Sequence, residues 1–198
     1  QSYCFLCIMQ NNEISYYINK AKSLPPLETE KKIRVGLLSS FTINGLEEII
    51  RVKCHNSNIA CQTYVSGYNQ YVQEILDKSS KLYSFSPDLT FLILDTRTFL
   101  GDLFHFPYSI SNDERRIFVN NKIRELLDLI DYFNSNSKSK LIIFNFQIPT
   151  YSPYGISENK QDFGLLEMIK KTNNEIEIYV KSKENIFCYD FNNFVTFF

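Results

Sequence analysis

Residues 33–42, IRVGLLSSFT, pass from an apolar run typical of a β-strand into a short polar turn. The apolar residues of the segment that follows, 46–50 (LEEII), recur at helical spacing, so the turn joins a strand to a helix. In an α/β sheet such a turn lies at the carboxyl ends of the strands, where side chains and free helix N–H groups converge on ligands. We therefore predict a functional site around Ser40.

The same alternation of strand and helix continues along the chain. Besides the first strand, we predict strands at residues 59–65, 89–94, 140–146 and 185–189. Helical spacing is found in residues 71–82, 119–130 and 163–180, whereas residues 96–111 and 147–161 are predicted to be loops. Helical crossovers between successive strands predict a mostly parallel five-stranded sheet, in a flavodoxin-like three-layer α/β/α sandwich.

The length and composition of the chain predict one compact domain with an N-terminal extension. The chain has 198 residues, of which 44% are hydrophobic, enough for one sizeable core. A helical pattern at residues 12–24 ends at Pro25 and Pro26. We expect residues 1–31 to be a helical arm and residues 32–198 to be the α/β domain.

Charge and cysteine content exclude several classes of partner. The chain has 21 basic and 22 acidic residues and no concentrated basic patch, so we expect no nucleic-acid partner. Its apolar runs are far shorter than the roughly 20 residues that span a bilayer, so we expect no membrane partner. Five scattered cysteines indicate a reducing compartment, and we expect the cytoplasm. Cys4 and Cys7 are not followed by a second ligand pair, so we expect neither a metal nor a cofactor.

Polar residues occur at the end of each of the first four predicted strands, and parallel strands bring such ends to one edge of the sheet. The candidate ligand-binding residues are Ser39, Ser40, Thr42, Gly67, Asn69, Asp95, Arg97, Asn145 and Gln147. Each also has a structural alternative. Ser40 or Thr42 fits a helix cap, Asn69 fits a turn, and Asp95 fits an ion pair with Arg97.

Two sets of motifs carry a family resemblance. Residues 39–42 (SSFT) and 87–95 (PDLTFLILD) resemble blocks of the SGNH (GDSL) hydrolase fold. Residues 67–77 (GYNQYVQEILD), 80–88 (SKLYSFSPD) and 94–97 (LDTR) look more specifically like the N-terminal domain of FkbH-like proteins. The resemblance covers residues 32–198.

This resemblance implies that the chain is a fragment of a longer protein, in which a HAD-type phosphatase-like domain follows covalently. Family members load a glyceryl group from a glycolytic bisphosphoglycerate onto an acyl carrier protein for polyketide synthesis, or act in related surface-glycan pathways. The implied partners are therefore an acyl carrier protein or a small anionic three-carbon acyl substrate. Residues 92–98 (LILDTRT) superficially match the HAD nucleophile motif, but Arg97 replaces its second aspartate. A guanidinium cannot serve as the general acid and base near neutral pH.

Carried over onto the SGNH motifs, Ser40 matches the nucleophile and Ser39 replaces the aspartate before it. Gly67 or Asn69 falls near the glycine block, and residues 95–97 stand where Gly-x-Asn would supply an oxyanion donor. The final Asp-x-x-His block is absent, because residues 190–193 read DFNN and correspond better to the aspartate of the preceding strand end.

The chain has two histidines that could act as the missing base. His55 is predicted at the end of the first helix of the domain, where it interacts with the helix dipole. His105 lies in an aromatic loop, where we expect it to be half-packed; it is the histidine we considered for reaching Ser40. A serine without an adjacent base is a poor nucleophile.

These observations leave three hypotheses. The first is a non-hydrolytic domain that binds a substrate or carrier-protein group for a linked transfer domain. The second is an active serine esterase or acyltransferase whose Asp and His lie beyond residue 198. The third is a scaffold without a ligand. If Arg97 is not neutralised by Asp95, we expect the crevice to prefer an anionic ligand.

Overall fold

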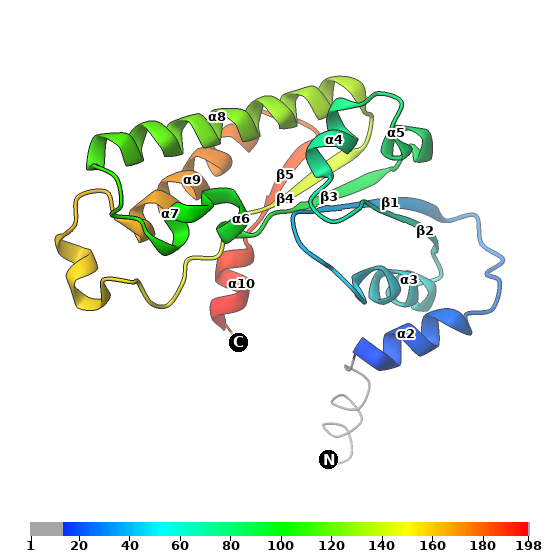
Figure 1. Ribbon diagram of the computed structural model, residues 1–198. Helices are drawn as coiled ribbons and strands as arrows, with labels where there is room; N and C mark the ends of the chain where they lie inside the picture. The colour runs from blue at the N-terminus through cyan, green and yellow to red at the C-terminus, as the bar shows by residue number, and fades with distance from the viewer. Residues whose placement is uncertain (1–13, 198) are drawn as a thin grey trace, which may run out of the picture.

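The computed structural model describes residues 14–197 and contains the predicted five-stranded sheet (Figure 1). The strands are β1 (Lys32–Ser39), β2 (Ala60–Val65), β3 (Leu89–Ile93), β4 (Lys140–Phe144) and β5 (Ile186–Tyr189). They are arranged in the order β2-β1-β3-β4-β5, and all four pairings are parallel. The predicted flavodoxin-like architecture is therefore confirmed.

Helices connect the strands on both faces of the sheet (Figure 1). They are α2 (Ile14–Lys22), α3 (Leu46–Asn56), α4 (Tyr71–Leu76), α5 (Lys81–Phe85), α6 (Thr96–Leu100), α7 (Asp102–His105), α8 (Asn112–Asn136), the 3₁₀ helix η1 (Gly155–Lys160), α9 (Leu165–Val180) and α10 (Phe191–Phe197). None of these helices, within residues 14–197, is long and apolar enough to cross a membrane.

The prediction of a loop over residues 96–111 is wrong for most of its length, because α6 and α7 lie there. Asp95 starts α6 by accepting hydrogen bonds from the N–H groups of Arg97 and Thr98. Gly101, with a φ of 58°, ends α6 and starts α7. Such short helices depend on their caps, since a single turn has no room for an apolar periodicity. The predicted loop over residues 147–161 ends in η1.

Side chains alternate between the two faces of the sheet, and one face forms the main core. Leu38, Leu92 and Ile143 occupy neighbouring positions of β1, β3 and β4 and are fully buried. They pack beneath α4, α8 and α9 together with Val119, Ile130, Phe133, Leu165, Met168, Ile169 and Ile176. These strands are buried in the way expected of the centre of a parallel sheet.

The opposite face carries α3, which packs against β2, and α2 packs on α3 in turn (Figure 1). Tyr17, Ala21 and Val52 form a small second core between these two helices. The described part of the predicted N-terminal arm is thus a helix that rests on the domain. Cys4 and Cys7 lie outside the described residues.

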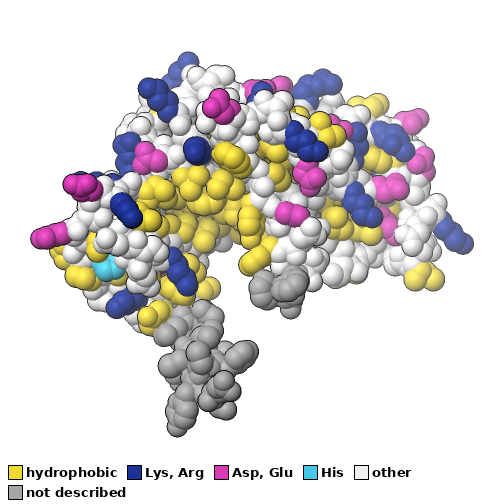
Figure 2. Space-filling model, turned by 180° about the vertical axis from the view of Figure 1, so that it is seen from behind, with side chains coloured by type: hydrophobic (Ala, Val, Ile, Leu, Met, Phe, Trp, Pro, Cys, Tyr) yellow, Lys and Arg dark blue, Asp and Glu magenta, His cyan; other side chains and the backbone are white. Residues whose placement is uncertain are grey.

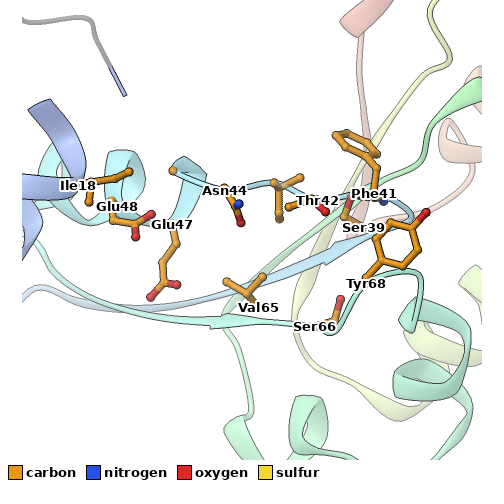
Figure 3. A pocket seen from close by; sticks show the side chains of 12 residues that line it. Ile18, Ser39, Phe41, Thr42, Asn44, Glu47, Glu48, Val65, Ser66 and Tyr68 are labelled. Atoms are coloured by element: carbon orange, nitrogen blue, oxygen red, sulfur yellow. Dashed lines mark hydrogen bonds between the residues drawn. The ribbon is translucent and has the colours of Figure 1, made fainter. Parts of the chain in front are cut away.

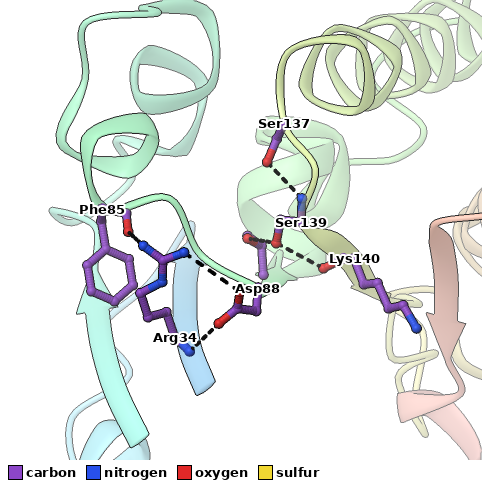
Figure 4. Close-up of polar contacts among 7 residues, drawn as sticks. Arg34, Phe85, Asp88, Ser137, Ser139 and Lys140 are labelled. Atoms are coloured by element: carbon purple, nitrogen blue, oxygen red, sulfur yellow. Dashed lines mark hydrogen bonds and ion pairs between the residues drawn. The ribbon is translucent and has the colours of Figure 1, made fainter. Parts of the chain in front are cut away.

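The Pro87-Asp88 segment of the family motif has a structural role at the amino edge of the sheet (Figure 4). The Asp88 carboxylate accepts a 2.8 Å hydrogen bond from the N–H of Arg34 and lies 3.7 Å from the Arg34 guanidinium. The backbone N–H and C=O of Asp88 pair with Arg34 and Lys140, which flank it in β1 and β4. Next to it, the buried hydroxyls of Thr90 and Ser139 are 2.8 Å apart. These contacts fix the register of the three central strands.

Candidate active-site crevice

Ser40 lies at the carboxyl edge of the sheet, as predicted, but its hydroxyl is already used within the fold. Its Oγ accepts a 2.8 Å hydrogen bond from the N–H of Asp95, and its own N–H donates to the carbonyl of Ile93. The residue is only 1% exposed. Ser40 therefore ties the end of β1 to the end of β3, and a substrate in solvent does not reach its oxygen.

Asp95 is held by backbone groups rather than by its neighbour Arg97. The Oδ2 atom of Asp95 accepts hydrogen bonds of 3.1 Å and 3.2 Å from the N–H groups of Arg97 and Thr98. Among residues 14–197, no ion pair joins the side chains of Asp95 and Arg97. The exposed Arg97 guanidinium instead lies 5.8 Å from the centre of the Phe104 ring. The positive charge of Arg97 is therefore available to a ligand.

A hollow of about 170 Å³ brings together predicted residues from the ends of β3 and β4. Asp95 and Arg97 line it from one side, and Gln147 and Tyr151 line it from the other. The hydroxyl of Thr96 donates a 3.2 Å hydrogen bond to the carbonyl of Gln147, which links the two strand ends. We refer to this site as the Arg97 hollow. It offers a guanidinium, a carboxylate, an amide and a phenol to a small ligand.

A second hollow, of about 320 Å³, lies over the ends of β1 and β2 and beside α2 (Figure 3). Its walls include Ser39 and Thr42, together with Ile18, Phe41, Ile43, Asn44, Gly45, Glu47, Glu48, Val65, Ser66 and Tyr68. It contains two carboxylates and no basic side chain, and the Glu47 carboxylate accepts a hydrogen bond from Thr63. This hollow is therefore unsuited to an anion, which separates Ser39 and Thr42 from the Arg97 hollow.

Ser66 was not singled out from the sequence, although it lines this second hollow (Figure 3). Its Oγ is buried and has no hydrogen-bond partner among the described residues, while its N–H donates to Leu37. The signal in the sequence that could have identified Ser66 is its position just after the end of β2. The residues predicted there were its neighbours Gly67 and Asn69.

Gly67 and Asn69 line neither hollow. The Gln70 side chain folds over Gly67, where a Cβ atom would lie 2.3 Å from its Oε1, so a larger residue at this position would displace that flexible side chain. Asn69 is exposed and has a φ of 52°, which is the left-handed conformation of a turn residue. Asn69 is therefore a turn residue, which is the structural alternative given for it above.

Asn145 follows β4 and is 3% exposed. Its side-chain amide forms hydrogen bonds that hold the start of α10. Its Nδ2 donates to Asp190 at 2.9 Å, and its Oδ1 accepts from the N–H of Asn192 at 2.8 Å. The hydrogen bond from Asn145, followed by one from the Asn193 N–H, lowers the pKa of the Asp190 carboxyl. Asn145 thus joins β4 to the start of α10 and is the structural counterpart of Ser40 at this end of the sheet.

Neither histidine is hydrogen-bonded to Ser40 within the described residues. His55 is in the last turn of α3, as predicted, and its Nε2 lies 3.2 Å from the carbonyl of Pro25. The helix α3 starts near the carboxyl edge of the sheet and runs back toward the amino edge. His55, in its last turn, therefore lies toward the amino edge, away from Ser40. His105 is exposed and packs edge-on against the Phe104 ring. The crevice described here has no base for Ser40.

A buried polar network that the sequence did not predict fixes the loop carrying Gln147 and Tyr151. The Glu158 carboxylate is buried and accepts hydrogen bonds from Tyr108, Ser152 and the N–H of Leu166. Burial opposes ionisation, but the hydrogen bonds from Ser152, Tyr108 and the backbone of α9 outweigh it and lower the pKa of Glu158. This anchor gives the loop one defined position.

Arg115 completes the same network from α8. The arginine is 5% exposed and donates hydrogen bonds to the carbonyls of Ile110, Asp162 and Phe163. Its guanidinium also lies 5.0 Å from the centre of the Tyr108 ring. These polar residues have no periodicity in the sequence, so no local signal pointed to them.

The fold is an α/β domain with a parallel five-stranded sheet and polar residues at its carboxyl edge. The chain belongs to the FkbH N-terminal domain family, whose model matches residues 34–198. No curated protein sequence is similar enough to the chain to count as a relative.

Two solved structures are similar to the chain. One is the N-terminal part of the protein BF1531 from Bacteroides fragilis, containing a phosphatase domain complexed with Mg, with a TM-score of 0.75 and 18% identity. The match covers 92% of this chain and 46% of that chain, so the present chain spans less than half of that protein. The other is a GDSL-like lipase from Bacteroides thetaiotaomicron, with a TM-score of 0.45, 16% identity, and coverage of 89% of this chain and 78% of that one.

Proposed function

We propose that this chain is the non-hydrolytic N-terminal domain of a longer, cytoplasmic FkbH-type protein. In this proposal it holds a small anionic acyl substrate, or the acyl group of a carrier protein, for a phosphatase-like domain in the same polypeptide. Membership in the FkbH N-terminal domain family supports this role, as does the presence of a phosphatase domain in the similar B. fragilis protein. The domain itself makes and breaks no bond.

The observation that carries the proposal is that Ser40 is buried and that its hydroxyl is hydrogen-bonded within the fold. A serine nucleophile needs an exposed Oγ that donates its proton to a base. Here the Oγ is buried and accepts a hydrogen bond from Asp95, and neither histidine is hydrogen-bonded to it within residues 14–197. An active esterase would need a base from outside residues 14–197 and a rearrangement of the β1 and β3 ends. The esterase alternative is therefore the weaker one.

The Arg97 hollow is the part of the crevice best suited to the proposed ligand. A guanidinium binds carboxylate and phosphate groups through two parallel N–H donors, and Arg97 has no carboxylate partner among the described residues. Gln147 adds amide donors, and Tyr151 adds a hydroxyl from the opposite wall. Because Asp95 is occupied by two backbone N–H groups, it leaves the guanidinium free for the ligand.

Calorimetric titration of the chain with a phosphorylated three-carbon acid tests the proposal. We expect saturable binding that Arg97→Ala weakens at least tenfold, which corresponds to about 1.4 kcal/mol. Arg124→Ala, which removes an exposed arginine of α8, is the matched control and should leave the affinity unchanged. Absence of detectable binding at millimolar ligand, or equal losses for both variants, would favour a scaffold without a ligand.

A further inference from the structure

One face of the sheet is only partly covered by helices. α3 lies over β2 and the neighbouring β1, and α10 contacts the carboxyl ends of β4 and β5. Between them the outward side chains of β3 and β4 are half-buried and those of β5 are exposed, and Figure 2 shows hydrophobic side chains gathered between the α2–α3 pair and the C-terminal end. This surface, which we call the aromatic face, consists of Leu89, Phe91, Ile142, Phe144, Phe187 and Tyr189.

The strand register places five of these side chains in two rows on one face. Phe91, Ile142 and Phe187 are direct neighbours on β3, β4 and β5. Phe144 and Tyr189 form the next row toward the carboxyl edge. Their rings are in contact across the strands, since Phe144 lies 6.1 Å from Phe91 and 4.8 Å from Tyr189 between ring centres. The aromatic face is therefore continuous.

The exposure of this face is unusual for a parallel sheet. Phe187 is 46% exposed and Tyr189 is 38% exposed, whereas Ile186, which points to the other face, is 2% exposed. Parallel strands are ordinarily covered on both faces, and continuous exposed apolar patches mark interaction sites. The strands thus have the composition of a covered sheet, while the described residues cover only part of it.

We infer that the aromatic face is the docking surface for the phosphatase-like domain of the same polypeptide, an inference that rests on the function proposed above. The B. fragilis protein has a phosphatase domain in the chain whose first part matches this one. The helix α10 lies at the rim of the aromatic face, with Phe191 packed on Phe144 and Phe194 packed on Tyr189. Residues that follow α10 therefore start next to this face, so a domain linked there reaches it without a long connection.

Docking on this face would also fix the linked domain relative to the Arg97 hollow. Phe144 and Tyr189 end β4 and β5 at the same edge where Arg97 and Gln147 lie, because the strands are parallel. A domain that covers these rings stands beside the carboxyl edge.

The test uses the full-length protein with a specific protease site inserted after residue 198. Phe187→Glu places a charge in the middle of the aromatic face, and Ile178→Glu is the matched control because Ile178 is 53% exposed on α9. After cleavage we expect the two halves of the wild type and of the control to elute together in size-exclusion chromatography. The halves of Phe187→Glu should separate, with at least a tenfold loss of affinity.

Three outcomes would overturn the inference: separation of the wild-type halves, retention of the complex by Phe187→Glu, or a dimer of the 198-residue chain that Phe187→Glu dissociates. The last result would assign the aromatic face to a second copy. Thermal unfolding of the 198-residue variants controls for folding, and an exposed position such as Phe187 should change little. Anion titration of Phe187→Glu separates this inference from the proposed function, since the variant should still bind the ligand at Arg97.

Discussion

The backbone N–H of Asp95 donates a 2.8 Å hydrogen bond to the Oγ of Ser40, 55 residues earlier in the chain. This contact joins the ends of β1 and β3 and so stabilises the crevice at the carboxyl edge of the sheet. In the function proposed above, Arg97 and Gln147, which line the adjoining hollow, hold the ligand.

Ser40→Ala should destabilise the domain by about 1–3 kcal/mol, because the Asp95 N–H loses its buried acceptor. Urea unfolding followed by circular dichroism measures the change. Ser109→Ala removes an exposed hydroxyl that also makes a hydrogen bond, to the carbonyl of Phe106, and should cost less than about 1 kcal/mol. Equal costs for the two variants would contradict the structural role of Ser40.

Glu158→Gln should lower stability at pH 7 by roughly 2 kcal/mol, because hydrogen bonds to a buried carboxylate are lost. The pKa of Glu158 is lowered in the folded state, so its contribution is fully present above the ordinary value of 4.5 and is lost as the pH falls below it. The difference in unfolding free energy between wild type and variant should therefore shrink below pH 4.5. A deficit of Glu158→Gln that stays constant across this pH range would argue against an ionised Glu158.

The hydroxyl pair of Thr90 and Ser139 predicts a coupled double-mutant cycle. Thr90→Val should cost about 1–3 kcal/mol, because it leaves the buried Ser139 hydroxyl without its side-chain partner. Adding Ser139→Ala should recover part of that loss, since both polar groups are then gone. Chemical denaturation of the four proteins gives the coupling energy. Additive losses would show that the two hydroxyls do not interact.

Asn145→Ala should reduce stability by about 1–3 kcal/mol and leave the affinity for a phosphorylated three-carbon acid unchanged within twofold. The reason is that the Asn145 amide is fully engaged with Asp190 and Asn192. Thermal unfolding and calorimetric titration of one preparation measure both quantities. A stable variant with lost binding would instead make Asn145 a ligand-binding residue.

The strands, their parallel order and the gathering of polar residues at one edge follow from local patterns, as with the apolar run before Ser39. The roles of individual residues do not. Whether Ser40 is a nucleophile or an acceptor depends on where the Asp95 N–H lies, and this is decided by the pairing of β1 with β3. The anchor around Glu158 combines Tyr108 and Ser152 from loops, where polar side chains carry no periodic signal.

The capacity of Ser40 for covalent chemistry tests the central claim most directly. The 198-residue chain is incubated with a fluorophosphonate probe and analysed by intact mass, and its hydrolysis of a simple aryl ester is compared with that of Ser40→Ala. Because the Oγ of Ser40 is buried and accepts the Asp95 N–H, we predict no Ser40 adduct and equal rates for both proteins. A stoichiometric adduct on Ser40, together with turnover that Ser40→Ala abolishes, would contradict the account and assign an active serine hydrolase to this fold.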